Sequence, residues 1–375
     1  MEVFLKIMKN IIKFRKGIVL AFPFFLFALE MAAQDVPHLP QRTDSLIRSH
    51  LTPHQDSIYS VRKEKLRQEH IKLEKRYRDR AQRVDTSYIQ RPNERLTLRV
   101  IDNVSVAGIT ARMAYRDDIE GDMRGKMETE GEWRNTITFG ANYLGIGVAL
   151  AINPAKIFGK HTSTEFNINK YGNNFGFDVV YMKNNSYSGK MKFGEERYNI
   201  ERRTFSNETM TLDGYYVFNG KKFSFPAAFS QTYKQIKSAG SLMLGASFNR
   251  SKLINDSYDP DAGYILRKIN VNQFAVGVGY GYNWVPTRRW LIHCSAMPFF
   301  GVFRHNRVYL HDEKVKMPYR FPEMQVVGRV AAIYNVKKYF WGMTGVFNFQ
   351  SSGDRDVFLL KNYKSRIRLI FGFRL

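Results

Sequence analysis

Residues 273–284 read QFAVGVGYGYNW and alternate between two kinds of side chain. Every second residue from Phe274 to Trp284 is an aromatic residue or a valine, and the residues between them are small or polar, three of them glycine. Because side chains of a strand alternate between its two faces, the large residues share one face. A strand of a soluble sandwich also alternates, but a row of glycines rarely lines its second face. Strands of membrane β-barrels turn apolar residues to lipid and small or polar ones to the lumen. The stretch therefore predicts a barrel strand.

The same alternation recurs along the chain in about twelve segments, and an even number returns both ends of a barrel to the periplasmic side. Connections after the first, fifth, seventh, ninth and eleventh segments are long, as expected of extracellular loops. We therefore predict an all-β fold, an antiparallel transmembrane β-barrel of about twelve strands, or fourteen if two more are hidden near Leu96 or within residues 220–237. The segments lie near residues 104–116, 133–143, 144–152, 162–170, 174–184, 209–219, 239–250, 271–284, 289–303, 323–336, 338–350 and 362–375.

The last segment shows the pattern most clearly. Ile367, Leu369 and Phe371 point one way, and Arg366 and Arg368 point the other. A final strand with an aromatic and an apolar residue among its last three is typical of outer-membrane barrels, in which the barrel-assembly machinery reads the closing strand. The sequence thus predicts that machinery, outer-membrane lipids and lipopolysaccharide as partners.

The N-terminus has the order of a secretory signal peptide. Residues 1–16 are basic, residues 18–29 are apolar, and Ala32 and Ala33 precede Gln34. We predict a signal peptide over residues 1–33, with Met1 or Met8 as the true start, and export to the cell outer membrane. A single N-terminal membrane anchor is the alternative.

A polar linker over residues 34–52 leads to a predicted periplasmic helix over residues 53–84, and the barrel follows over residues 85–375. Thr52 can cap this helix, Pro53 suits its first turn, and Gln55 can return a bond to the cap residue. Its apolar residues keep no strict heptad. We expect a solvated helix, with a partner-docking or peptidoglycan-facing arm as the functional alternative.

The formal net charge of +24 first suggests nucleic acid as a partner. Part of this excess lies in the export signal and part in the basic helix, so we expect no nucleic-acid partner and assign the charge to anionic lipid or lipopolysaccharide. Cys294 is the only cysteine, which excludes a disulfide framework and a thiolate metal site. After the N-terminus no stretch has the roughly 18 consecutive apolar residues of a membrane helix.

Residues 85–89 read DTSYI, and residues 219–241 contain the stretches NGKKFS (219–224), PAAFSQ (226–231) and QIKSAGS (235–241). These two segments resemble the uncharacterised domain of unknown function 4421 family. The resemblance covers about residues 85–375 and implies an exported, barrel-like protein without an assigned activity or known catalytic residues. The residues of the second segment that we take as candidates are Lys221, Lys222, Phe223, Ser224, Gln231, Gln235, Lys237, Ser238 and Gly240.

Residues 220–237 fall on the predicted periplasmic side, yet they form a long connection. Two interpretations remain open. The segment could fold into the lumen as a plug, with Lys221, Lys222 and Lys234 facing acidic lumen groups. It could equally be an ordinary structural turn.

Charged residues on the predicted lumen face have both signs and could form a salt-bridge network that narrows or closes the pore. An open porin would more often separate the signs across a constriction. We take these residues as lumen or ligand candidates: Glu165, Asp178, Asp213 and Glu323 against Arg329, Arg366 and Arg368.

Catalytic and metal chemistry find little support. His293 and Ser295 could form a nucleophile and base, but they fall on the lumen side of their strand, and the chain has no Gly-x-Ser-x-Gly elbow. The aspartates Asp256, Asp259 and Asp261 fit a solvated loop better than a calcium site. We expect no enzyme activity, no cofactor and no metal. The predicted function is a narrow channel or a structural outer-membrane barrel. The alternatives are a lipid-modifying outer-membrane enzyme and a soluble periplasmic β-protein that binds an anionic partner.

Overall fold

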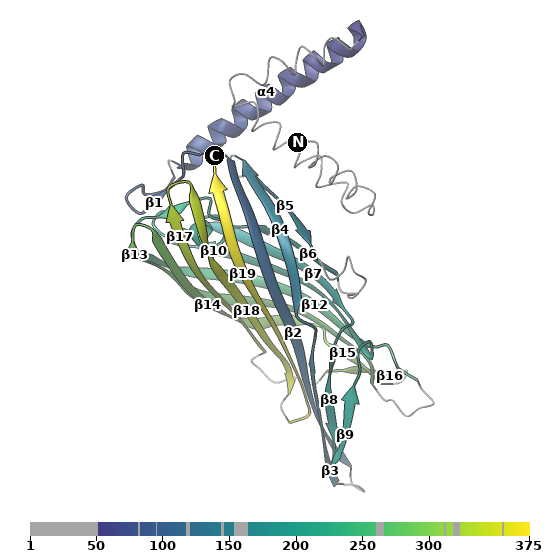
Figure 1. The fold of residues 1–375 in the computed structure, drawn as a ribbon. Coiled ribbons are helices and arrows are strands. Elements are labelled where there is room, and N and C mark those ends of the chain that lie inside the picture. Colours follow the sequence, from purple (N-terminus) through teal and green to yellow (C-terminus); the bar gives the residue numbers. More distant parts are fainter. Residues whose placement is uncertain are drawn as a thin grey trace.

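The structure is a computed structural model that describes residues 52–81, 83–94, 96–117, 121–143, 146–153, 164–259, 266–310, 313–317, 323–354 and 356–375. The predicted signal peptide and almost all of the predicted linker lie outside these residues. The described part consists of a long helix, a curled antiparallel sheet and a short helix inside that sheet (Figure 1).

Helix α4 spans Pro53–Ala81 and is polar on all sides, so it has no apolar face to bury against the sheet. It begins as predicted, with the amide of Asp56 donating to the carbonyl of Thr52 at 2.9 Å. At about 1.5 Å per residue it extends for roughly 43 Å, and it points away from the barrel (Figure 1). One contact to the wall is the hydrogen bond between His70 Nε2 and Tyr143 Oη at 2.9 Å. None of the described helices is both long and apolar enough to cross a membrane.

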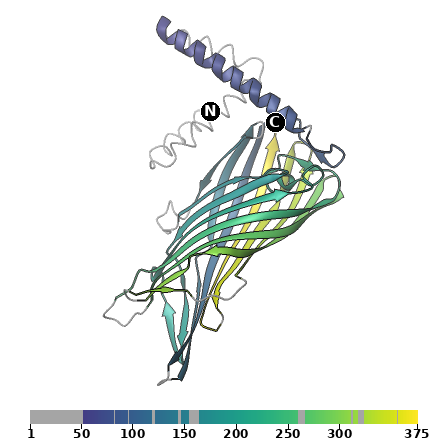
Figure 2. The same cartoon turned by 180° about the vertical axis from the view of Figure 1, so that it is seen from behind.

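The wall of the barrel contains twelve strands in the described part of the chain, which confirms the predicted fold. Each strand pairs antiparallel with the next from β6 round to β5. The sheet curls so that the chain-consecutive strands β5 and β6 lie along the same side (Figures 1 and 2). The order around the wall is β6 (Thr164–Lys170), β7 (Phe175–Asn184), β10 (Phe205–Val217), β12 (Ala239–Asn255), β13 (Leu266–Thr287), β14 (Trp290–Arg304), β17 (Met324–Val336), β18 (Tyr339–Asp354), β19 (Phe358–Arg374), β2 (Leu96–Asp117), β4 (Arg134–Tyr143) and β5 (Ile146–Ile152).

No further wall strand is found at the two places where we considered one, as far as the described residues go. The extra length near Leu96 simply extends β2. Residues 220–237 instead form helix α6 (Phe225–Phe229) and the two-residue strand β11 (Lys234–Gln235), which pairs with β1 (Ile89–Gln90). We call the end of the barrel that holds Leu375, α4 and α6 the proximal end, and the other end the distal end.

At the distal end, strands continue into the connections that we expected to be loops. The expectation is wrong for residues 121–130, which form β3 and pair with β2 and β8. Exposed charges of opposite sign on one face of β3 support this extension, such as the 2.6 Å ion pair of Lys126 Nζ with Glu128 Oε1. The distal strands are β3 (Gly121–Glu130), β8 (Ser188–Phe193), β9 (Glu196–Ile200), β15 (Arg307–Leu310) and β16 (Glu313–Lys316).

The polarity of β13 inverts along its length. In its proximal half the outward residues are apolar and exposed, from Phe274 to Trp284, and the inward residues are small or polar. In its distal part the outward residues are polar, such as Lys268, whereas the inward Ile269 and Val271 are almost fully buried. One strand thus combines two patterns. Its proximal segment has apolar residues outside, as in a membrane barrel, and its distal segment has apolar residues inside, as in a water-soluble protein.

Neighbouring strands invert at the same level. On β12 the outward apolar residues end at Phe248, which pairs with Phe274 of β13 and with Leu212 of β10. On β10 the outward residue changes from Glu208 to the exposed Met210 at this level. The outward apolar residues therefore form a continuous belt around these strands.

Beyond the belt the distal end is filled by a hydrophobic core. It is built from inward residues of the wall together with residues of the distal strands, among them Ile109, Leu253, Ile269, Val308 and Phe358. We call this part the distal cap.

Candidate functional site

The proximal end of the lumen is occupied by α6, which begins and ends with defined caps. Ser224 accepts a hydrogen bond from the amide of Ala227, and Pro226 lies in the first turn. The amides of Ser230 and Gln231 both donate to the carbonyl of Pro226. A single turn of helix is unstable in water, so its stability must come from packing. All five residues of α6 are buried.

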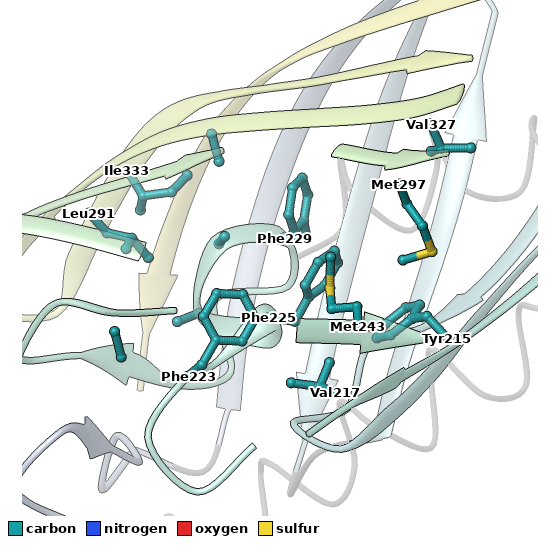
Figure 3. Close-up of a cluster of buried hydrophobic side chains, with 14 of the residues drawn as sticks. Tyr215, Val217, Phe223, Phe225, Phe229, Met243, Leu291, Met297, Val327 and Ile333 are labelled. Carbon is teal, nitrogen blue, oxygen red and sulfur yellow. The ribbon is translucent and has the colours of Figure 1, made fainter. Parts of the chain in front are cut away.

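Phe225 is the centre of this packing (Figure 3). Its ring lies 4.8 Å from Tyr215 of β10, 4.9 Å from Phe229 and 5.3 Å from His293 of β14, measured between ring centroids. Phe223 and the inward residues Met243, Leu291, Met297 and Ile333 complete the cluster. Of our two interpretations, the structure has residues 223–231 inside the barrel, and we call them the plug.

Gln235 closes the plug segment through its side-chain amide. Its Nε2 donates to the carbonyls of Lys222 at 2.6 Å and Lys237 at 2.9 Å, and its Oε1 accepts from the amide of Ser224 at 2.9 Å. The side chain thus joins both ends of the segment, which explains why a long connection folds into one compact unit.

Asn283 of β13 connects the plug to the wall. Its Nδ2 donates to the carbonyl of Ser224 and to Gln235 Oε1, both at 2.9 Å. Its Oδ1 lies 2.7 Å from His293 Nδ1, and His293 Nε2 lies 3.0 Å from Ser295 Oγ. His293 and Ser295 are only 1% and 5% exposed, so this polar chain is enclosed between plug and wall.

A strap formed by residues 85–90 covers the plug from the proximal side. The amide of Asp85 donates to the carbonyl of Lys221, the amide of Ile236 donates to that of Tyr88, and Ile89 is fully buried. The turn is held by Ser87, whose hydroxyl and amide donate to Asp85 Oδ1, and these hydrogen bonds lower the pKa of Asp85. The structure therefore brings together the two segments on which the family resemblance rests.

The lysines of the plug segment do not face acidic lumen groups, so this part of our prediction is wrong. Lys221 and Lys222 are exposed at the rim, where their charges stay hydrated, and Lys222 Nζ lies 5.1 Å from the centre of the Tyr88 ring. Lys237 lies on the same ring at 5.6 Å. Lys234 is half-buried, and burial lowers its pKa, with Arg374 adding to the effect.

Ser238 and Gly240 lie where the segment joins β12. Ser238 Oγ accepts from the amide of Val285 at 2.9 Å. A Cβ on Gly240 would lie within 2.0 Å of Tyr280 Oη, so a larger residue would displace that ring.

Two arginines that our site prediction omitted hold the end of the plug. Arg99 of β2 donates to the carbonyl of Ser230 at 3.2 Å. Arg374 of β19 donates to the carbonyl of Gln231 at 3.3 Å and to Asn335 Oδ1 at 3.0 Å, and its guanidinium lies over the ring of Phe340. They satisfy carbonyls that a helix end leaves without partners. Strand parity already puts Arg374 on the lumen face, but nothing local indicates its partner.

Above the plug lies a cavity of about 80 Å³ that gathers five of the predicted lumen residues. Arg329 Nη2 lies 3.3 Å from Asp178 Oδ2 in a nearly buried ion pair, and Tyr171 Oη donates to Asp178 at 2.9 Å. Asp213 accepts from Ser247 at 2.6 Å. The five predicted residues that line the cavity are Asp178, Asp213, Arg329, Arg366 and Arg368.

The other two lumen candidates are not part of this arrangement. Glu323 lies towards the distal end, where its Oε1 accepts from the amide of Gly353 at 3.0 Å. The backbone of Glu165 lies in β6, but its side chain lies outside the described residues.

Between the cavity and the distal cap, amide side chains cross the lumen. Asn249 Nδ2 donates to Gln350 Oε1 at 2.8 Å, and Gln350 Nε2 donates to Gln273 Oε1 at 2.6 Å. All three residues are buried. Plug, polar layer and distal cap therefore fill successive levels of the lumen.

The family model of the domain of unknown function 4421 (DUF4421) matches residues 83–375. The chain belongs to the DUF4421 family. In this DUF4421 protein, the family match begins at the strap and includes the plug, the cavity and every wall strand. A comparison with curated proteins found no match.

Several solved outer-membrane proteins are similar in fold to this DUF4421 protein. The outer-membrane protease OmpT of Escherichia coli is 10% identical, with a TM-score of 0.37, and the match covers 76% of this chain and 98% of OmpT. The translocator domain of the autotransporter NalP of Neisseria meningitidis is 12% identical, with a TM-score of 0.34, over 82% of this chain and 96% of that domain. An outer-membrane channel of Pseudomonas putida F1 is 11% identical, with a TM-score of 0.28, over 76% and 97% of the two chains.

Proposed function

We propose that this chain is an integral outer-membrane β-barrel whose lumen is closed at rest by its own plug. The observation that carries the proposal is the plug itself, a buried segment that is joined to the wall by Asn283, Arg99 and Arg374. A segment packed in this way leaves no room for a standing aqueous pore at the proximal end. The barrel then acts as a structural membrane protein, or as a narrow channel only when the plug moves.

The apolar belt supports the membrane location. On β13 it runs over the eleven residues from Phe274 to Trp284. With a rise of about 3.4 Å per residue and a tilt of about 45°, this corresponds to roughly 25 Å along the membrane normal, the height of the apolar band of outer-membrane barrels. Water-soluble β-proteins do not expose such a belt, because large apolar patches cause association.

The partners follow from this location. Outer-membrane lipids would surround the belt, and exposed distal cations such as Lys190, Lys314 and Lys316 suit the phosphates of lipopolysaccharide. The closing strand β19 would be read by the barrel-assembly machinery after export by the predicted signal peptide.

Conductance in planar bilayers tests the closed lumen. We expect the wild-type protein to be silent and the Phe225→Ala/Phe229→Ala variant to show ion-conducting events, because the double truncation removes the centre of the plug. The matched control is Phe166→Ala, which removes an exposed phenylalanine of β6. Steady conductance of the wild-type protein would overturn the closed state.

A lipid-modifying enzyme is the second candidate, and the hydrogen-bonded order Asn283, His293, Ser295 favours it. A nucleophile, a base and a group that orients the base are the parts of an acyl-transfer site. Burial of Ser295 beneath the plug opposes it, since a lipid acyl chain would need the plug to leave. Expression of Ser295→Ala in place of the wild type should leave outer-membrane lipid composition unchanged, and a lasting change would favour the enzyme.

A further inference from the structure

The cavity above the plug lies between the plug and five strands of the wall. Tyr171, which hydrogen-bonds to Asp178 in the cavity, lies 6.0 Å from the ring of Phe225, and the guanidinium of Arg329 lies 5.7 Å from that ring. The plug thus forms the floor of the cavity, and the walls come from β7, β10, β17–β18 and β19.

Cations outnumber carboxylates among the side chains that line this cavity. Lys364, Arg366 and Arg368 alternate along β19, so they share the lumen face at a spacing of roughly 7 Å. Arg329 adds a fourth cation, against the carboxylates Asp178 and Asp213.

Both lining carboxylates already accept hydrogen bonds from protein groups, Asp178 from Tyr171 and Arg329, and Asp213 from Ser247. The three cations of β19 also interact with other groups of the protein. Placing like charges side by side in a lumen of low dielectric is costly unless opposite charge accompanies them.

We propose that the cavity above the plug binds a small phosphate-like oxyanion. Arginine presents a planar fork of donors that matches phosphate oxygens, and the hydroxyls of Thr209 and Thr211 line the same space. The cavity volume of about 80 Å³ suits several water molecules or one tetrahedral anion in their place. The anion comes either from solution or from a phosphorylated lipid headgroup.

The experiment is thermal unfolding of the full chain in a zwitterionic detergent, followed by tryptophan fluorescence during titration with inorganic phosphate at constant ionic strength. A ligand that binds only the folded state raises the unfolding midpoint in a saturable way. We expect such a rise with phosphate and no equivalent rise with chloride. A second arm replaces phosphate by lipid A, compared with its dephosphorylated form, and a rise only with phosphorylated lipid A assigns the anion to a headgroup.

The Arg366→Gln/Arg368→Gln variant should weaken the apparent affinity about tenfold or more, because each arginine contributes a charge-assisted hydrogen bond. The matched control is Lys361→Gln, which removes an exposed cation from the same strand and should leave the titration unchanged. If the double variant does not fold, the Arg368→Lys variant takes its place. It retains the positive charge but loses the planar pair of guanidinium donors, so it should also weaken the affinity for phosphate.

The proposal is overturned if neither phosphate nor phosphorylated lipid A raises the midpoint of the wild-type protein. It is also overturned if the double variant responds as the wild type does. These results do not depend on whether the barrel conducts ions, so failure here leaves the closed-barrel proposal standing, and the reverse also holds.

Discussion

At the scale of residues, the side-chain amide of Gln235 determines which atoms of Asn283, His293 and Ser295 donate hydrogen bonds and which accept them. Its Nε2 faces only carbonyls, so its Oε1 must be the atom that accepts from Asn283 Nδ2. Asn283 Oδ1 then has to accept from His293 Nδ1, which carries the proton of the neutral ring. His293 Nε2 is left as an acceptor for the hydroxyl of Ser295. A motif residue of the plug thus sets the tautomer of a wall histidine.

Asn283→Ala should lower the free energy of unfolding by about 2–4 kcal/mol, because it leaves buried polar atoms of Ser224, Gln235 and His293 without a partner. Urea unfolding of the refolded protein measures this change. Asn199→Ala, at an exposed position of β9, is the control and should have almost no effect. Equal stability of the two variants would contradict the hydrogen bonds that Asn283 forms with the plug and with His293.

At the scale of elements, the plug and the strap depend on each other. Helix α6 is too short to persist alone, and a two-residue strand such as β1 has little stability of its own. They are stabilised together, since β1 pairs with β11 while Ile89 is buried against the barrel. Removal of either element should therefore loosen the other.

Ile89→Ala tests this coupling. Truncation of a fully buried isoleucine should cost about 2–5 kcal/mol and release the strap. The side chains of Lys222 and Lys237 are already exposed, and release of the strap frees the backbone beside them to enter the active site of trypsin. We expect faster cleavage after these lysines, measured by mass spectrometry of timed digests. Ile58→Ala on the exposed face of α4 is the matched control. Cleavage at the wild-type rate in both variants would show that the plug holds without the strap.

At the scale of the whole molecule, two folding regimes share the same strands. The proximal part is apolar outside and polar or small inside, whereas the distal cap is apolar inside, as in a water-soluble protein. Long strands such as β2 and β13, each of 22 residues, pass through both regimes without interruption. Each wall strand from β7 round to β4 is hydrogen-bonded to a neighbour on both sides, which satisfies its backbone groups as the membrane interior requires.

Labelling of the single cysteine tests whether the outward apolar residues of the proximal part are covered by lipid. Cys294 is exposed on β14, between Ile292 and Ala296, which share its outward face in the belt. In isolated outer membranes it should resist a water-soluble maleimide and react only after denaturation. A Cys294→Ala/Tyr198→Cys variant moves the thiol to the exposed distal hairpin and should react at once in intact membranes whose outer face is accessible. Rapid labelling of native Cys294 would favour the soluble periplasmic alternative.

Much of the wall could be read from residue order alone. The twelve strands, the outward faces of β10, β12, β13 and β19, and the inward direction of Arg366, Arg368, His293 and Ser295 follow from a period of two, which is a local property of an extended chain. The helix over Pro53–Ala81 and the family followed from local motifs in the same way.

Only the tertiary structure decided what fills the barrel. Whether residues 220–237 were a turn or a plug depended on contacts with Asn283, Arg99 and Arg374, which come from strands far apart in the sequence. We predicted that the rim lysines face acidic groups in the lumen, and this is wrong. A lysine can keep its charge hydrated at an exposed edge or form an ion pair inside the lumen, and the sequence does not show which of the two has the lower free energy. Alternation is a property of neighbours along the chain, so the sequence determined the wall by itself. The contents of the lumen depend on which side chains meet across the barrel, and that is settled only when the sheet closes.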